Sequence, residues 1–213
     1  MTSESRVQEK LGSPAEIIEE LFAKQKQYIN YFFDSLDLAA AAPFFQACLD
    51  CRGSLIFTGV GKSGIIAEKI AMTLVSTGTR AHFLSPINFL HGDIGMISSE
   101  DAVVMLSKSG EAEELLNILP FFKRREAKIL TIVSNPVSRL AKIADVSVYL
   151  PVEKELCPFD LAPTTSTAVQ LLFGDLLAAA LMRAKGFSLD DYIQNHPLGS
   201  IGKKMTVKVK NLM

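Results

Sequence analysis

Short apolar runs alternate with helix-like stretches along most of this chain, and this alternation limits the possible folds more than any other feature. The apolar runs cover residues 54–58, 81–84, 102–106, 129–133 and 146–150. Helical patterns over 65–77, 112–125 and 136–144 separate most of them. Strands that alternate with helices form right-handed βαβ units, whose parallel sheet is covered on both faces. The sequence therefore predicts an α/β fold, a three-layer sandwich around a five-stranded parallel sheet.

Further helices are predicted at both ends of this unit. Residues 14–36 carry apolar side chains at helical spacing, and four of them are aromatic. This stripe is consistent either with contact to a second subunit or with packing inside the chain's own core. A nearly all-apolar helix is predicted over 166–185, where Gly186 ends it. Because no linker or repeat is visible, we expect one domain over 1–213, with a loose N-terminus over 1–13.

The composition excludes several classes of protein. The chain has 213 residues, of which 48% are hydrophobic and 21% charged, as in ordinary globular proteins. A net charge of −1 argues against a nucleic-acid-binding surface. No apolar run approaches the roughly 18 residues of a membrane span, and residues 1–13 lack the apolar core of a signal peptide. Three cysteines suit a reducing compartment, so we expect a cytoplasmic protein.

A glycine-rich turn follows the first predicted strand and opens a helix. Gly59, Gly61 and Gly64 surround Lys62 and Ser63, so backbone N–H groups, a helix dipole, a cation and a hydroxyl meet at one point. The turn therefore predicts an anion site, most simply for a phosphate. Alternatively, the glycines serve only the geometry of a tight turn. That explanation does not account for Lys62 and Ser63.

Two nucleotide-binding motifs were compared with this turn. A Walker A loop requires a glycine at the position of Ile56, which excludes it. The G-x-G-x-x-G spacing of dinucleotide-binding proteins is present, but the second predicted strand ends without the acidic residue that holds the ribose. Elsewhere, Cys48 and Cys51 form a C-x-x-C that closes a helix before a strand and has no second pair, which favours a structural role.

Polar residues follow the predicted strands, and in a parallel sheet they meet at one edge. The strand-end residues fall in 59–64, 88–93, 107–114, 134–135 and 153–158. Seven segments, several of which overlap these strand ends, occur in a set order along the chain: 59–64, 76–79, 91–95, 107–111, 154–158, 161–167 and 196–197. Together they resemble the sugar isomerase (SIS) family, specifically the arabinose-5-phosphate isomerases, over roughly residues 15–213. The resemblance implies a flavodoxin-like sheet and interconversion of D-ribulose 5-phosphate and D-arabinose 5-phosphate, which feeds the synthesis of KDO for lipopolysaccharide.

The same resemblance implies a homotetramer with sites near subunit boundaries, so that a neighbouring subunit supplies some groups. Longer family members continue into paired CBS domains. This chain ends at Met213, where those domains would begin, and is expected to be a short form that lacks the pair. The reaction requires no metal, and no local histidine spacing preforms a metal site, so neither a metal nor an organic cofactor is expected.

Five residues stand where the family places its catalytic groups. Glu114 and Glu155 are assigned the proton transfers, for which a carboxyl pKa raised toward neutrality is best suited. His91 and His196 are candidates for opening the sugar ring, and Lys62 for stabilising the enediolate. The alternative for Glu114 is an acid that stabilises a helix N-terminus. No helix dipole accounts for an acid at Glu155; the alternative there is a surface loop charge, since Glu153 and Lys154 lie beside it.

Hydroxyl and glycine residues at three predicted helix starts are expected to bind the phosphate. They are Gly61, Ser63, Ser107, Ser109, Thr164, Thr165 and Ser166. Plain N-capping is the alternative, although one hydroxyl per helix would suffice for it.

Three further residues are interpreted individually. His82 is expected in the core and Asp175 as a buried hydrogen-bonded group, while Asp93 is expected to orient the loop of His91. These roles are structural rather than catalytic.

Three positions depart from the family pattern, namely Asn88, Lys108 and Leu198. A glutamate, a small polar residue and a glycine are usual there, so Asn88 and Leu198 bear on substrate choice or rate. Two other functions therefore stay open: an isomerase of a different phosphosugar, and a non-catalytic phosphosugar sensor.

Overall fold

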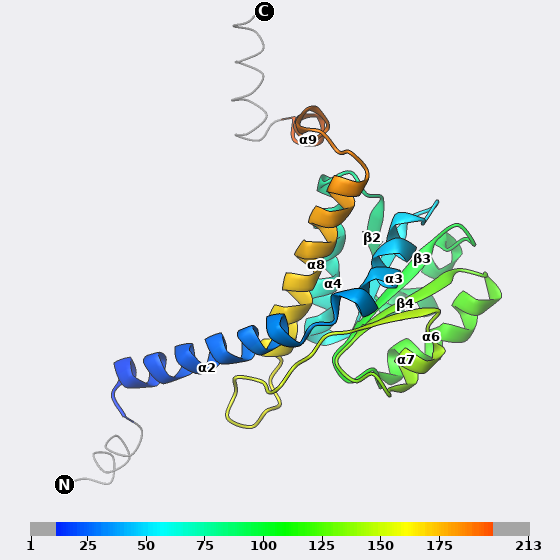
Figure 1. Ribbon diagram of the computed structural model, residues 1–213. Helices are drawn as coiled ribbons and strands as arrows, with labels where there is room; N and C mark the ends of the chain where they lie inside the picture. Colours follow the sequence, from blue (N-terminus) through cyan, green and yellow to red (C-terminus); the bar gives the residue numbers. More distant parts are fainter. Residues whose placement is uncertain (1–11, 198–213) are drawn as a thin grey trace, which may run out of the picture.

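The computed structural model describes residues 12–197, and a five-stranded parallel sheet lies at its centre (Figure 1). The strands are β1 (Leu55–Gly59), β2 (Ala81–Phe83), β3 (Ala102–Ser107), β4 (Lys128–Val133) and β5 (Val146–Tyr149). Their order in the sheet is β2-β1-β3-β4-β5. The predicted α/β class, strand number and parallel pairing are confirmed, because each apolar run forms a strand whose ends lie within one residue of the expected bounds.

Helices cover both faces of the sheet and enclose two separate apolar clusters. Alternate strand residues face each side: Phe57 contributes to one cluster and Ile56 to the other. On the Phe57 side lie α3 (Leu38–Leu49), α4 (Gly61–Ser76) and α8 (Thr165–Ala184). On the Ile56 side lie α5 (Pro86–Leu90), the 3-10 turn η1 (Asp93–Met96), α6 (Glu113–Arg124) and α7 (Arg139–Ile143). The three-layer sandwich is thereby confirmed.

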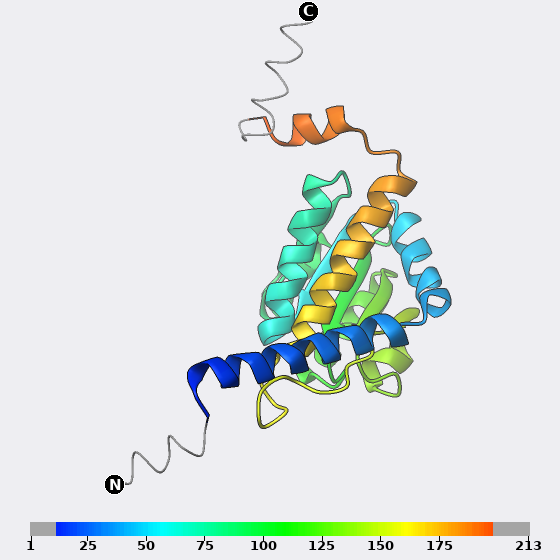
Figure 2. The ribbon, with the colours of Figure 1, turned by 60° about the vertical axis from the view of Figure 1, so that its left-hand side comes forward.

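The helix predicted over 14–36 is present as α2 (Pro14–Ser35), and it stands out from the body of the molecule (Figure 2). A capping box of Ser13 and Glu16, with Pro14 in the first turn, explains its start. Only Phe32 of α2 is buried, whereas Ile18, Phe22 and Phe33 are 60–69% exposed. Packing within the chain's own core therefore does not account for the apolar stripe.

Helix α8 corrects one expectation drawn from the sequence. By length and composition alone it is the one helix of the described residues that could cross a membrane, so the statement that no apolar run reaches that length is wrong. Half of its most apolar window is buried. Gly174 lets α8 approach α4 closely, since a Cβ there would lie 2.3 Å from Ile70 Cγ1. These contacts are those of a core helix.

Candidate active site

Two of the predicted polar segments, 59–64 and 107–111, lie at the carboxyl ends of β1 and β3, which are neighbours in the sheet. Gly59 pairs with Leu106 in register, so the turns that leave these strands lie side by side. The chain turns from β1 into α4 on one face and from β3 into α6 on the other. This reversal is the topological switch point at which parallel α/β sheets bind ligands.

The β1–α4 turn has the geometry of an anion site. Gly61 has a φ of +58°, a conformation that L-residues rarely adopt. Gly64 packs against the end of β1, where a Cβ would lie only 2.6 Å from the Gly59 carbonyl oxygen. The N-cap residue of α4, Val60, supplies no side-chain hydrogen bond. Lys62 is exposed and Ser63 half-buried, so a charge and a hydroxyl accompany the first amide groups of the helix.

The β3–α6 loop holds Ser107 and Ser109 in a tight turn. Ser107 Oγ accepts a hydrogen bond from Gly110 N at 3.0 Å, and Ser109 Oγ accepts one from Glu111 N at 3.2 Å. Each hydroxyl keeps its own proton to donate. Arg139 at the start of α7 braces this loop through Glu111, whose Oε2 lies 2.6 Å from Arg139 Nε. The loop therefore presents two donors on a braced turn.

Glu155 is the most enclosed ionisable group of the site. Its side chain has no exposed surface, and its Oε1 lies 2.8 Å from Lys108 Nζ. Its Oε2 accepts hydrogen bonds from Thr164 N at 2.8 Å, Thr164 Oγ1 at 3.2 Å and Ser166 N at 3.1 Å. The carboxylate thus caps the N-terminus of α8. The statement that no helix dipole accounts for this acid is wrong, because the α8 dipole does.

The surroundings of Glu155 also correct the expectation of a raised pKa. Burial alone would raise it, but the Lys108 ammonium and the donors at the start of α8 outweigh burial and lower the pKa from 4.5 to about 2. As it lies here, Glu155 is a firmly ionised carboxylate. It accepts a proton poorly until one of these donors is withdrawn.

The start of α8 is partly occupied by this carboxylate. Two of the groups expected to hold phosphate, Thr164 and Ser166, donate backbone N–H groups to Glu155 instead. Thr165 Oγ1 and Ser166 Oγ are buried with no hydrogen-bond partner in the described structure. Plain N-capping by Thr164 is not observed, because its side chain makes no cap hydrogen bond.

Glu114 and His91 lie on the Ile56 side of the sheet. Glu114 is exposed in the first turn of α6, where it stabilises the helix N-terminus as well as being available to a ligand. His91 is exposed at the C-terminal end of α5. No contact in the described structure joins either side chain to Lys62 or Glu155.

His196 lies at the opposite end of the molecule from the other site residues. It follows α9 (Leu189–Asn195), stacks on Tyr192 and contacts the Tyr192 carbonyl oxygen through Nδ1 at 2.8 Å. Asn195 Nδ2 donates a hydrogen bond to Ser76 O at the C-terminal end of α4, whereas Lys62 lies in the first turn of that helix. The 16 residues of α4 separate the two ends by about 24 Å. Figure 1 shows α9 next to the C-terminal end of α8, away from the loop that precedes α8.

Several residues interpreted as structural are placed differently from expectation. His82 is exposed because β2 is a short edge strand, and Asp175 is exposed and paired with Lys69 across α4 and α8, so both were wrongly assigned to the interior. Asp93 is half-buried at the start of η1 and has no resolved hydrogen bond to His91 in the described structure. Leu198 lies outside the described residues.

The C-x-x-C pair is structural, as expected. Cys48 is buried on the inner face of α3, and burial raises the pKa of its thiol to about 12. Burial also raises the pKa of the Cys51 thiol, which donates to the carbonyl oxygens of Ser54 and Glu100. Neither thiol is a ready nucleophile or metal ligand.

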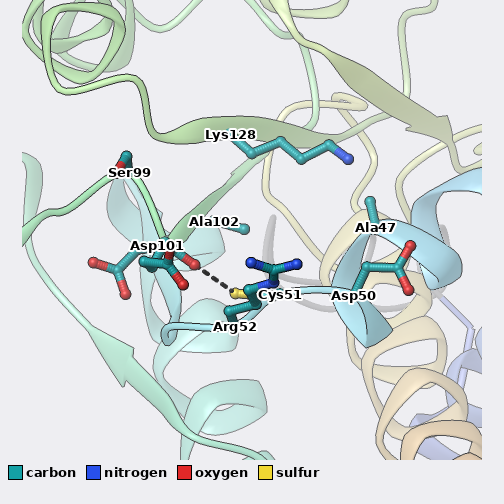
Figure 3. Close-up of a pocket in the computed structure, with 9 residues that line it drawn as sticks. Ala47, Asp50, Cys51, Arg52, Ser99, Asp101, Ala102 and Lys128 are labelled. Carbon is teal, nitrogen blue, oxygen red and sulfur yellow. Dashed lines mark hydrogen bonds between the residues drawn. The ribbon is translucent and has the colours of Figure 1, made fainter.

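A separate cavity of about 270 Å³ lies at the amino ends of β1, β3 and β4 (Figure 3). Arg52, Lys128 and Asp50 line it together with Cys51. Its buried acid, Asp101, already accepts hydrogen bonds from Ser54 and Ser98, so this carboxylate is not an unpartnered group. Within residues 12–197 no three acidic, histidine or cysteine side chains gather in a way that could hold a metal.

Two features of the site had no reliable signal in the sequence. Lys108 was noted only as a departure beside a phosphate site, yet it is the ion-pair partner of Glu155. Asp160 accepts a hydrogen bond from Glu155 N at 2.6 Å and thereby shapes the loop before α8. Both contacts depend on the path of that loop, which no residue spacing indicates.

Comparison with known proteins identifies the family. A family model described as the SIS domain matches residues 49–180. The chain is 41% identical over 198 residues to arabinose 5-phosphate isomerase KdsD of Yersinia pestis and 43% identical over 198 residues to an uncharacterized protein of Chlamydia pneumoniae. These alignments cover 93% of this chain but only 58% and 60% of the two relatives, so the chain spans about three fifths of their length.

A solved structure extends the comparison to three dimensions. An E. coli CFT073 protein in complex with arabinose 5-phosphate is 34% identical, has a TM-score of 0.82, and the match covers 92% of this chain and 100% of that one. The likeness in three dimensions, the family model and the sequence identities all agree with the architecture described above. This chain belongs to the SIS domain family.

Proposed function

We propose that this protein interconverts D-arabinose 5-phosphate and D-ribulose 5-phosphate through a cis-enediolate. The observation that carries the proposal is the buried carboxylate of Glu155, which lies beside a serine loop suited to phosphate at the switch point of the sheet. A KdsD relative at 41% identity and a structural relative solved with arabinose 5-phosphate support the choice of sugar. Such an activity would supply the synthesis of KDO for lipopolysaccharide in the cytoplasm.

The reaction moves one proton between C2 and C1 and another between O1 and O2. In the aldose-to-ketose direction a carboxylate removes the C2 proton, the C1–C2 enediolate forms, and the same proton returns to C1. We assign this transfer to one of Glu155 and Glu114, and the transfer of the hydroxyl proton from O2 to O1 to the other. Lys62 stabilises the negative enediolate oxygen, and the donors of Ser63, Ser107 and Ser109 hold the phosphate. No step requires a metal or an organic cofactor.

The site is completed by a second copy of the chain. His196 lies about the length of α4 away from Lys62, so it reaches the same substrate only if it comes from a neighbouring subunit. The exposed apolar side chains of α2 suit such a contact between subunits. We therefore propose a homo-oligomer, and specifically a tetramer, as the resemblance to the arabinose-5-phosphate isomerases implies. In this assembly His196 of one subunit opens the sugar ring bound to another subunit. His91 is the alternative for this step.

Turnover of D-arabinose 5-phosphate by the purified protein is the test. We expect activity in the wild type, and a loss of about 100-fold or more in Glu155→Gln and in Lys62→Ala. Glu153→Gln, which removes an exposed carboxylate two residues from Glu155, is the matched control and should retain activity. Turnover of another phosphopentose or phosphohexose, with none of arabinose 5-phosphate, would contradict the proposed substrate.

A non-catalytic phosphosugar sensor is the second candidate. It is favoured by the firm ionisation of Glu155, because a carboxylate with a pKa of about 2 suits binding better than proton transfer. A sensor would be stabilised against thermal unfolding by phosphosugars while converting none of them. Conversion with the expected loss in Glu155→Gln would exclude it.

A further inference from the structure

Lys108 lies where two functions of the site meet. Its neighbours in the chain, Ser107 and Ser109, form the loop expected to bind phosphate. Its ammonium extends to Glu155 Oε1 at 2.8 Å. The Lys108 side chain is 39% exposed, whereas the carboxylate that it contacts has no exposed surface. The ammonium therefore borders both solvent and the buried acid.

A phosphate on this serine loop would create an electrostatic conflict. It would bring about two negative charges close to the buried Glu155 carboxylate, and like charges raise each other's proton affinity. The start of α8 cannot relieve the conflict, because the N–H groups of Thr164 and Ser166 are already bonded to Glu155. Lys108 is the cation that the described structure places in contact with this carboxylate.

We propose that the Lys108 ammonium is shared between Glu155 and the phosphate of the bound sugar, so that phosphate binding withdraws the cation from Glu155 and releases that carboxylate for proton transfer. This inference rests on the proposed function. It makes Lys108 a positioning residue that couples recognition of the phosphate to activation of the base. A small polar residue at this position, as in the family pattern, would bind phosphate without that coupling.

The other partners of Glu155 explain why Lys108 alone can be redistributed. The N–H groups of Thr164 and Ser166 are set by the helix backbone, and the Thr164 hydroxyl that donates to Glu155 is held in place by a hydrogen bond from Leu156 N. Asp160, from the loop before α8, contacts only the backbone N–H of Glu155. The Lys108 side chain has a flexible four-carbon stem and an exposed flank, so it can turn toward a ligand without moving an element.

The decisive experiment is a carboxyl ¹³C NMR titration of the Glu155 side chain, assigned with Glu155→Gln, from about pH 7 down to about pH 1.5, so that the low starting pKa lies within the range. Inorganic phosphate is the probe, and amide shifts in residues 107–110 report its binding. We expect phosphate to raise the apparent pKa of Glu155 by about one unit or more. In Lys108→Met the pKa should already be raised and should respond less to phosphate, and Lys108→Arg should restore the response.

Three results would overturn the inference. The first is an unchanged Glu155 titration while the amides of 107–110 show bound phosphate, and the second is an equal response in Lys108→Met and the wild type. The third is a lack of amide shifts at saturating phosphate, since no phosphate would then reach Lys108. Because the titration needs no turnover, a protein that fails to convert arabinose 5-phosphate but shows the coupling would contradict the proposed function alone.

Discussion

Glu155 stabilises the local fold through the same contacts that set its ionisation. The carboxylate stabilises the start of α8 through two backbone N–H groups and an ion pair with Lys108. The same contacts lower its pKa to about 2, so the carboxylate as it lies in this structure is a weak base. A raised pKa would have required burial without these donors.

The stability of the protein should therefore depend on Glu155 at acid pH. Its folded pKa lies below the unfolded value of 4.5, so its contribution is fully present above about pH 4.5 and is lost as the pH falls toward 2. By about pH 3 the wild type should lose about 2 kcal/mol of unfolding free energy from this group. Glu155→Gln should cost about 1–3 kcal/mol at pH 7 and remove that part of the pH dependence. Urea unfolding at both pH values measures this, and parallel pH curves for the two proteins would contradict it.

Gly64 is a second position where a single residue decides local structure. In an ordinary helix, Gly→Ala gains up to about 1 kcal/mol. Here the added Cβ would lie 2.6 Å from the Gly59 carbonyl oxygen, and the clash should outweigh the gain, destabilising Gly64→Ala by about 1–3 kcal/mol. Gly95→Ala, whose Cβ would meet nothing within 4 Å, is the matched control for thermal unfolding. Equal melting temperatures for the two variants would refute the close-packing argument.

At the scale of elements, the apolar sequence pattern of α2 is not matched by its packing against the rest of the chain. Its apolar spacing predicts a buried face, yet Ile18, Phe22 and Phe33 remain exposed while Phe32 alone is buried. Such a face is explained by a partner that covers it. The helix itself is well formed, because its capping box and first-turn proline act locally.

Charges placed on the exposed face of α2 should therefore separate subunits without unfolding them. We expect Phe22→Glu combined with Ile18→Glu to shift the protein to a smaller species in sedimentation, with little change in the circular dichroism of the subunit. Phe32→Ala, at the buried position, should instead cost about 3–5 kcal/mol of stability. An unchanged sedimentation coefficient in the charged variant would place the subunit contact elsewhere.

At the scale of the whole molecule, the separation of Lys62 and His196 leads to a complementation test. Lys62→Ala and His196→Ala should each be inactive. In a mixed symmetric dimer one site carries both substitutions and the other carries neither, so co-expression should restore about a quarter of wild-type activity. Activity assays of the separate and co-expressed variants measure this. Restoration is impossible if Lys62 and His196 act from the same chain.

Much of the fold was predictable because its signals are local. The apolar runs and helical spacings indicated all five strands and four of the long helices, and Gly59, Gly61 and Gly64 indicated the turn at the switch point. Helix α3 was indicated only by the C-x-x-C expected at its end, without bounds, and it continues through Pro43. The candidate site residues were predicted from the family segments, whereas their contacts could not be predicted.

The sequence by itself determined the α/β class, the parallel sheet and the edge where the polar residues gather, because strand and helix periods are set by neighbouring residues. Only the tertiary structure decided that Glu155 caps α8 beside Lys108, and that His196 lies at the far end of α4. These outcomes depend on where two loops bring distant residues in space. The free energy of such contacts comes from burial and from charge interactions between residues far apart in the sequence, and no local sequence pattern indicates these.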